Sequence, residues 1–213
     1  YAVEIENSYE RDAMMSRIIS SLSDDITHPN STDPYEIMAY LLQKNEISKS
    51  APVIIKLISR ILQLITNSYV RLTGLSNLAE SSLQLHDSVH AKQILEEICL
   101  NIPNLPAEYQ KVLMLSDLTV LFCQIDTKIA SDCLNQGIQK LENVEYDREA
   151  VARRQIVFAI VRLNAFAPDP ELIGTALQIV EKITEPAEYI NSLMAVYSMV
   201  RKDKSRCNEL LHF

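Results

Sequence analysis

The sequence predicts an all-α fold in which antiparallel helix pairs stack into an α-solenoid. Four tyrosines recur at positions 69, 109, 146 and 189, which are 40, 37 and 43 residues apart. Two segments, Pro106–Tyr109 and Pro186–Tyr189, both read proline-alanine-glutamate-tyrosine. The chain has only 3 glycines and 8 prolines in 213 residues, which favours helices over turn-rich β structure. A period in this range is typical of stacked helix pairs.

Apolar residues keep the same register after two of these tyrosines. The distance from Tyr69 to Ile98 is 29 residues, as is the distance from Tyr109 to Ile138. Five aligned pairs lie between them: Leu75 and Leu115, Leu78 and Leu118, Leu85 and Ile125, Val89 and Ile129, and Ile94 and Leu134. Each unit is therefore expected to hold one helix A, a turn and one helix B.

The third unit is longer than the other two. Tyr146 to Ile183 spans 37 residues, 8 more than the corresponding stretches. The segment Ala165–Pro170 contains two prolines, and proline cannot continue a helix. We therefore expect the extra residues to lie in the turn between helix A and helix B.

We expect a single helical-repeat domain over residues 1–213. It comprises N-terminal helices in 1–68, repeat units at 69–108, 109–145 and 146–188, and a truncated or capping unit at 189–213. The N-terminal helices are predicted from about Tyr9 to Leu22, from Pro34 to about Asn45, and from Ser50 to about Thr66. Because the third is apolar nearly all round, we expect it to be central, or alternatively to form a homodimer seam at Pro52–Ile65.

Composition narrows the class of partner. The net charge of −8 opposes binding to nucleic acid, and no run of 18 apolar residues is present to span a bilayer. The four cysteines, at 99, 123, 133 and 207, form no Cys-x-x-Cys pair, which indicates reduced thiols in a reducing, cytoplasmic compartment. The sequence thus favours another protein as the partner, with a homodimer also open.

Few residues are arranged for chemistry. His86 and His90 flank Asp87 at a spacing that binds zinc on a continuous helix, but the aligned Asp126–Thr127 suggests a turn there. Asp24–Asp25 with His28 is a second, weaker candidate for a metal. We expect no enzyme activity, no cofactor and no metal; the alternative is an all-α metal-dependent hydrolase or transferase at His86 and His90. Gly74, Gly137 and Gly174 fall within predicted helices, where they are expected to permit close helix contacts.

The stretch from Leu75 to Pro103 resembles a tetratricopeptide repeat. Leu75 and Leu78–Ala79 match the helix A pattern of that family, and Ala91, Leu95, Ile98 and Pro103 fall at its helix B and terminal-proline spacings. The next unit departs from it, with Thr119 at the small position and Asn135 where a large apolar residue is expected, and the units exceed the usual 34 residues.

The resemblance implies that helix A of each unit lines a concave groove that binds a peptide or helix of a partner, as in an adaptor, scaffold or chaperone. The candidate groove residues are Asn77, Ser116, Val120, Arg153, Arg154 and Val157, with Leu193 and Val196 on the last helix A. Two alternatives stay open. The apolar members could instead be buried by the next helix, and the arginines could pair with Glu149 or Asp147 on the surface.

Overall fold

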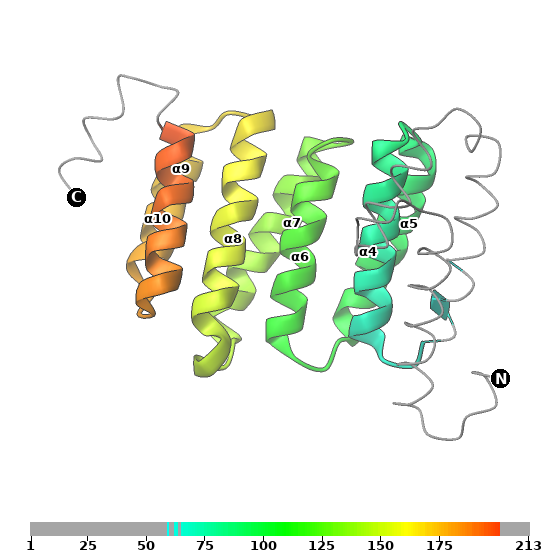
Figure 1. Cartoon of the computed structure of the whole chain (residues 1–213), viewed down its shortest axis with the longest axis horizontal. Coiled ribbons are helices and arrows are strands. Elements are labelled where there is room, and N and C mark those ends of the chain that lie inside the picture. Colours follow the sequence, from blue (N-terminus) through cyan, green and yellow to red (C-terminus); the bar gives the residue numbers. More distant parts are fainter. Residues whose placement is uncertain (1–58, 60–61, 64, 201–213) are drawn as a thin grey trace, which may run out of the picture. The chain divides into compact units, whose positions relative to one another are not determined.

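The computed structural model describes residues 59, 62–63 and 65–200 (Figure 1). These residues form seven α-helices and two short 3-10 helices, and contain no strand. The predicted all-α class is therefore confirmed. The chain divides into two compact units, Tyr1–Asn104 and Leu105–Phe213, each described separately below.

The described part of the first unit is a helix pair. It consists of α4 (Ser68–Gln84), α5 (Ser88–Asn101) and the 3-10 helix η2 (Ile102–Asn104). The side chain of Asn67 caps α4 by accepting a hydrogen bond of 3.1 Å from the backbone N–H of Val70. α4 packs against α5 through leucines and isoleucines that exclude water. The buried apolar residues of the two helices are Leu72, Leu75, Leu78, Ala79, Ala91, Ile94, Leu95 and Ile98.

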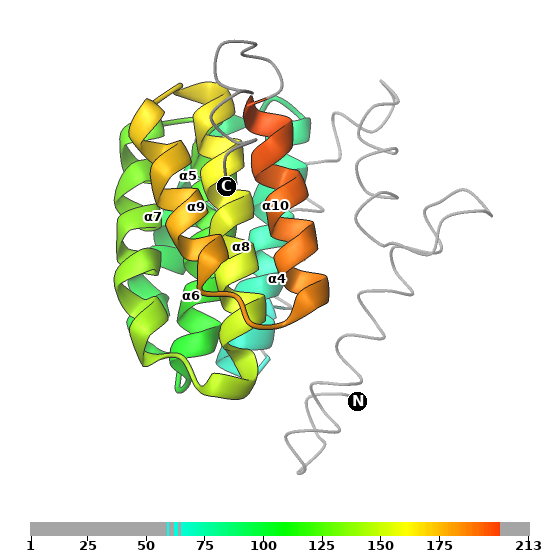
Figure 2. The ribbon, with the colours of Figure 1, turned by 90° about the vertical axis from the view of Figure 1, so that its left-hand side faces the viewer.

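The second unit has two layers of helices. Its α-helices are α6 (Glu108–Phe122), α7 (Thr127–Lys140), α8 (Tyr146–Phe166), α9 (Pro170–Glu181) and α10 (Pro186–Val200), with η3 (Leu141–Asn143) between α7 and α8. Figure 1 and Figure 2 show α6, α8 and α10 in one layer and α7 and α9 in the other. α8 packs against all four other α-helices, which makes it the central helix of this unit.

The predicted helix starts are confirmed. α4, α6, α8 and α10 all begin within three residues of the recurring tyrosines, at Ser68, Glu108, Tyr146 and Pro186. Helix B of each described pair begins after an aspartate cap. Asp87, Asp126 and Asp169 each accept a hydrogen bond from a backbone N–H two or three residues later. These caps satisfy donors that have no partner within the helix.

The predicted location of the third unit's extra residues is wrong. α8 has 21 residues and α6 has 15, whereas the connection after α8 is only Ala167–Asp169. The additional residues therefore lengthen helix A instead of the turn. The reason is local: Arg162–Phe166 contains no helix breaker, so the helix continues until Pro168 excludes it.

At two of the three glycines, a side chain would collide with a neighbouring residue. A Cβ on Gly137 of α7 would lie 2.7 Å from Cδ1 of Ile156 in α8, and a Cβ on Gly74 would overlap the side chain of Leu62. The predicted close contacts are thus confirmed at these positions. The prediction is wrong for Gly174, because nothing lies within 4 Å of a Cβ built there.

Several sequence predictions lie outside the described residues. They concern the two helices before residue 50, most of the helix predicted from Ser50 to Thr66, the acidic pair Asp24–Asp25 with His28, and Cys207. The proposed dimer seam at Pro52–Ile65 lies largely outside them as well.

Candidate functional site

The last described helix, α10, has two apolar faces. One face is buried and contains Ser192, Val196 and Val200. The other face is exposed, and we call it the α10 stripe; it consists of Tyr189 (38% exposed), Ile190 (55%), Leu193 (38%), Met194 (67%) and Tyr197 (53%). These positions recur at intervals of three and four residues, so they occupy one side of the helix. Exposed apolar residues gathered in this way mark interaction surfaces more often than isolated ones do.

The α10 stripe carries no charge. The only ionisable acid or base in α10 is Glu188, apart from the phenols of Tyr189 and Tyr197. Glu188 is directed toward α8: its Oε2 lies 2.9 Å from Nη1 of Arg154, and that Nη1 donates a hydrogen bond of 3.2 Å to Oε1. Docking an apolar surface on the stripe would therefore desolvate no charged group of α10 itself.

Comparison with α6 shows what distinguishes α10. Alignment of the two proline-alanine-glutamate-tyrosine segments places Met194 opposite Met114, and Tyr197 opposite Asp117. Met114 is 1% exposed, whereas Met194 is 67% exposed. Asp117 is an exposed carboxylate, whereas Tyr197 is an exposed aromatic side chain. α10 thus presents apolar side chains at positions where α6 has either a buried methionine or a charge.

The exposed aromatic residues of α8 are placed differently. The guanidinium of Arg154 lies 5.8 Å from the ring centre of Phe158, and that of Arg162 lies 5.5 Å from the ring centre of Phe166. Each phenylalanine therefore has a cation over its ring from the preceding turn of the same helix. This part of the surface is mixed in character, unlike the α10 stripe.

The structure separates the six predicted groove residues into two classes. Ser116, Arg153 and Val157 are buried, with exposed fractions of 2%, 8% and 0%. Asn77, Val120 and Arg154 are half-buried. Asn77 belongs to the first unit, and the other five belong to the second. Of the two further candidates, Leu193 is part of the α10 stripe, and Val196 is fully buried.

The three buried groove candidates interact with residues of their own unit. The hydroxyl of Ser116 donates a 2.9 Å hydrogen bond to the carbonyl oxygen of Val112 one turn earlier. Arg153 forms an ion pair with Glu149, to whose Oε1 its Nε donates at 2.9 Å. Arg153 therefore pairs with Glu149, as the alternative proposes, but in a buried position instead of on the surface, while Arg154 pairs with Glu188. Val157 lies in the core of the unit, where its substitution would affect folding before it could affect a partner.

Two groups of the second unit have shifted pKa values. The hydrogen bond from Lys111 lowers the pKa of Glu108, against opposing desolvation and with a further contribution from Lys140. Burial raises the pKa of the Cys123 thiol to about 11, although the positive charge of Arg162 opposes the shift. A thiol with this pKa stays protonated at neutral pH and is a poor nucleophile.

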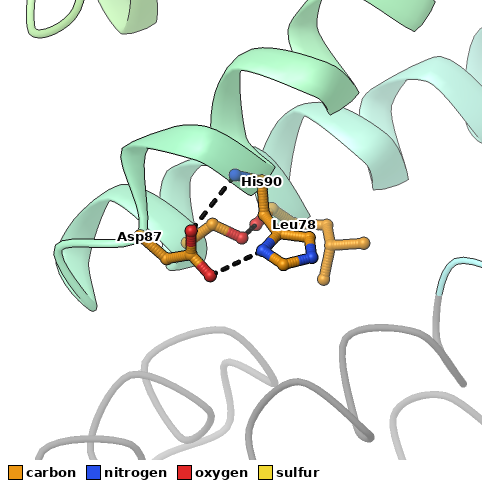
Figure 3. A network of polar contacts seen from close by, with 4 residues as sticks. Leu78, Asp87 and His90 are labelled. Atoms are coloured by element: carbon orange, nitrogen blue, oxygen red, sulfur yellow. Dashed lines mark hydrogen bonds and ion pairs between the residues drawn. The ribbon is translucent and has the colours of Figure 1, made fainter.

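His86 lies in the turn between α4 and α5, and His90 lies in the first turn of α5, so the pair spans the turn that the sequence predicts. His86 has a positive φ of 62° between the helices, and Asp87 caps α5. Figure 3 shows the side chains of Asp87 and His90 directed toward each other, with 2.7 Å between Oδ2 and Nδ1. The carboxylate also accepts a 3.1 Å hydrogen bond from the backbone N–H of His90. Asp87 and His90 therefore have a structural role, in which Asp87 caps the N-terminus of α5 and pairs with the side chain of His90.

Neither a cluster of metal-binding side chains nor a membrane-spanning helix is found in the described part of the chain. No group of three or more histidine, cysteine, aspartate or glutamate side chains in it could hold a metal ion. Among these same residues, no helix has both the length and the apolar character needed to cross a bilayer.

No family model, no curated protein and no solved structure matches this chain. The evidence for its function therefore lies in its own residues. Among them, the α10 stripe is the feature that intramolecular packing of the described residues explains least, because its side chains stay exposed next to a well-packed face of the same helix.

The sequence contained a signal for this surface. Residues 189–200 hold no aspartate, glutamate, lysine or arginine, although such residues make up 23% of the chain. A helix that is apolar on all sides needs neighbours on all sides. Applied to residues 189–200, this rule would have selected α10 before the structure was known.

Proposed function

We propose that this chain is a non-enzymatic protein-binding module of the tetratricopeptide-like, α-solenoid type, acting as an adaptor, scaffold or chaperone in the cytoplasm. The alternation of α6, α8 and α10 in one layer with α7 and α9 in the other supports a stack of helix pairs. Such stacks typically act through the surfaces that they present, and their ends require a polar or covered face.

The observation that carries this proposal is the exposed α10 stripe. Its five side chains offer an uncharged surface beside a face that already packs on α8 and α9. The complementary partner is a protein that presents the apolar face of an amphipathic helix, in the helix-to-helix mode of recognition. Val120 of α6 and Arg154 of α8 are predicted groove residues of the same unit that remain half-buried.

The charged groups beside the stripe are paired with each other. Arg154 and Glu188 neutralise each other at the N-terminal end of α10, which leaves apolar contact as the main source of affinity at the stripe. Tyrosines at both ends add large, rigid contact areas of the kind that dominate binding energy at protein interfaces.

The test compares the wild-type 213-residue chain with Met194→Glu, and uses Gln178→Glu as a matched control. Both substitutions introduce one negative charge at an exposed position, the first in the α10 stripe and the second on α9. Each is used to capture proteins from native lysate, and circular dichroism verifies that both variants keep the helical content of wild type.

The proposal predicts a protein that wild type and Gln178→Glu capture equally and that Met194→Glu captures at least tenfold less. Repetition with the purified partner must give the same order of affinities. Equal binding to all three proteins would exclude the α10 stripe as the docking surface.

A further inference from the structure

We infer that the α10 stripe binds the α10 stripe of a second copy of this chain, in an antiparallel arrangement around a two-fold axis near Leu193. This inference rests on the proposed function, because it names the partner of the same surface. It follows from the symmetry of the stripe, from its lack of charge and from its area.

Three of the five side chains of the stripe are placed symmetrically about Leu193. Tyr189 and Tyr197 lie four residues before and four residues after Leu193. If two copies of α10 cross in opposite directions at Leu193, each leucine contacts its equivalent, and Tyr189 of one copy meets Tyr197 of the other. A two-fold interface requires this kind of self-complementary surface. The two aromatic pairs would add edge-to-face or offset stacking to the contact.

The stripe also has the shape that helix packing requires. Tyr189, Leu193 and Tyr197 form one ridge of side chains spaced by four residues, and Ile190 and Met194 form a second, adjacent ridge. Two helices whose ridges have this spacing interlock at a crossing angle of about −50°, which is the most common class in globular proteins. Both ridges are exposed, so a second α10 could insert its own ridge between them.

The charge distribution favours contact between two copies at the stripe over contact elsewhere on their surfaces. Each chain has a net charge of −8, so two copies repel each other over most of their surfaces. The stripe itself contributes no like-charge contact, and the one acidic group on α10 is paired with Arg154. Added salt will therefore strengthen the association, because it screens the general repulsion and leaves the apolar contact intact.

The exposed area of the α10 stripe indicates a reversible dimer. Together the five side chains expose the equivalent of about two and a half whole residues, on the order of 500 Å² per copy at about 200 Å² per large side chain. A dimer would then bury at most about 1,000 Å² in total, which is the size of weak, transient interfaces. We therefore expect association in the micromolar range.

Sedimentation equilibrium of the 213-residue chain across micromolar concentrations tests the inference. Wild type and Gln178→Glu are expected to form dimers with equal affinity, and Met194→Glu to dimerise at least tenfold more weakly while keeping its helical content. Leu193→Cys provides the geometric test, because the proposed axis brings the two copies of Leu193 together. Under mild oxidation this variant should form a covalent dimer in a yield that wild type, with its native cysteines, does not reach.

Three results would overturn the inference: a wild type that stays monomeric throughout, a dimer unaffected by Met194→Glu, or no covalent dimer of Leu193→Cys. The lysate experiment distinguishes the two proposals. A different protein that depends on Met194, bound by a strictly monomeric chain, would refute self-association and leave the proposed function standing. If Met194→Glu alters neither self-association nor capture, both proposals fail.

Discussion

Arg154 of α8 and Glu188 of α10 form an ion pair between helices, with 2.9 Å between Nη1 and Oε2. Glu188 is the glutamate of the second proline-alanine-glutamate-tyrosine segment. Its counterpart in the first segment, Glu108, pairs with Lys140 of α7 at 3.1 Å as well as with Lys111 of its own helix. In both segments the repeated glutamate therefore connects the start of its helix to a cation on a neighbouring helix.

The Arg154–Glu188 pair should contribute measurably to stability. A double-mutant cycle with Arg154→Met and Glu188→Gln is expected to give a coupling free energy of roughly 0.5–1 kcal/mol, since both side chains are mostly buried but retain contact with solvent. Urea denaturation of the four proteins measures it. The control is the exposed pair Arg148–Asp147, separated by 3.5 Å, whose coupling should be near zero. Equal coupling in both cycles would contradict a structural role for Glu188.

Val157 and Val120 should respond differently to the same substitution. Val157→Glu places a carboxylate in a position with 0% exposure and is expected to destabilise the protein by more than about 3 kcal/mol. Val120→Glu changes a half-buried side chain and should cost roughly 1 kcal/mol or less. Thermal unfolding followed by circular dichroism separates the two. A folded and stable Val157→Glu protein would show that Val157 is accessible after all.

Replacement by alanine should change the free energy of unfolding in opposite directions at the glycines of α7 and α9. Gly174→Ala is expected to raise the free energy of unfolding by roughly 0.5–1 kcal/mol, because its Cβ would enter open space and alanine restricts the unfolded chain. Gly137→Ala should lower it, because its Cβ would come within 2.7 Å of Ile156. Denaturant titration decides the sign in each case, and stabilisation by Gly137→Ala would show that the terminal methyl group of Ile156 moves aside at little cost.

The buried thiol of Cys123 should make stability depend on pH at alkaline values. Its pKa is raised from 9.0 to about 11 in the folded protein, so the unfolded thiol ionises first as the pH rises. The free energy of unfolding should therefore be unaffected by this group below about pH 9, and should fall between pH 9 and 11. Comparison with Cys123→Ala isolates the effect, because tyrosines and lysines titrate equally in both proteins. An identical pH profile for the two proteins would contradict the shift.

Sequence reasoning was most successful where local chemistry decides the structure. Tyr109 and Tyr189 marked the starts of α6 and α10, and the alignment of Asp126 with Asp87 anticipated a turn followed by a capped helix. These features depend on residues close together in the chain. The all-α class followed from the same local preferences and from composition.

The candidate site was less predictable because burial depends on which helices become neighbours. The apolar pattern showed that Val157 lies on an apolar side of its helix, but α8 is packed against all four other α-helices of its unit, so that side is enclosed. α10 packs on α8 and α9, and its other side is open in the described part of the chain. The sequence of α8 does not show that this side is enclosed, because its burial depends on which helices become its neighbours, whereas the absence of charge in residues 189–200 is visible in the sequence of α10 itself.

The extra length of α8 also has a practical use. Its six residues beyond the length of α6 correspond to about 9 Å along the helix axis. Near this end, Arg162, Ala165 and Phe166 are exposed, and only Leu163 is buried. A single label or surface linker attached at Ala165 would therefore hold the molecule by the end of α8 without altering a residue of the α10 stripe, so that binding to an immobilised chain can be measured in one defined orientation.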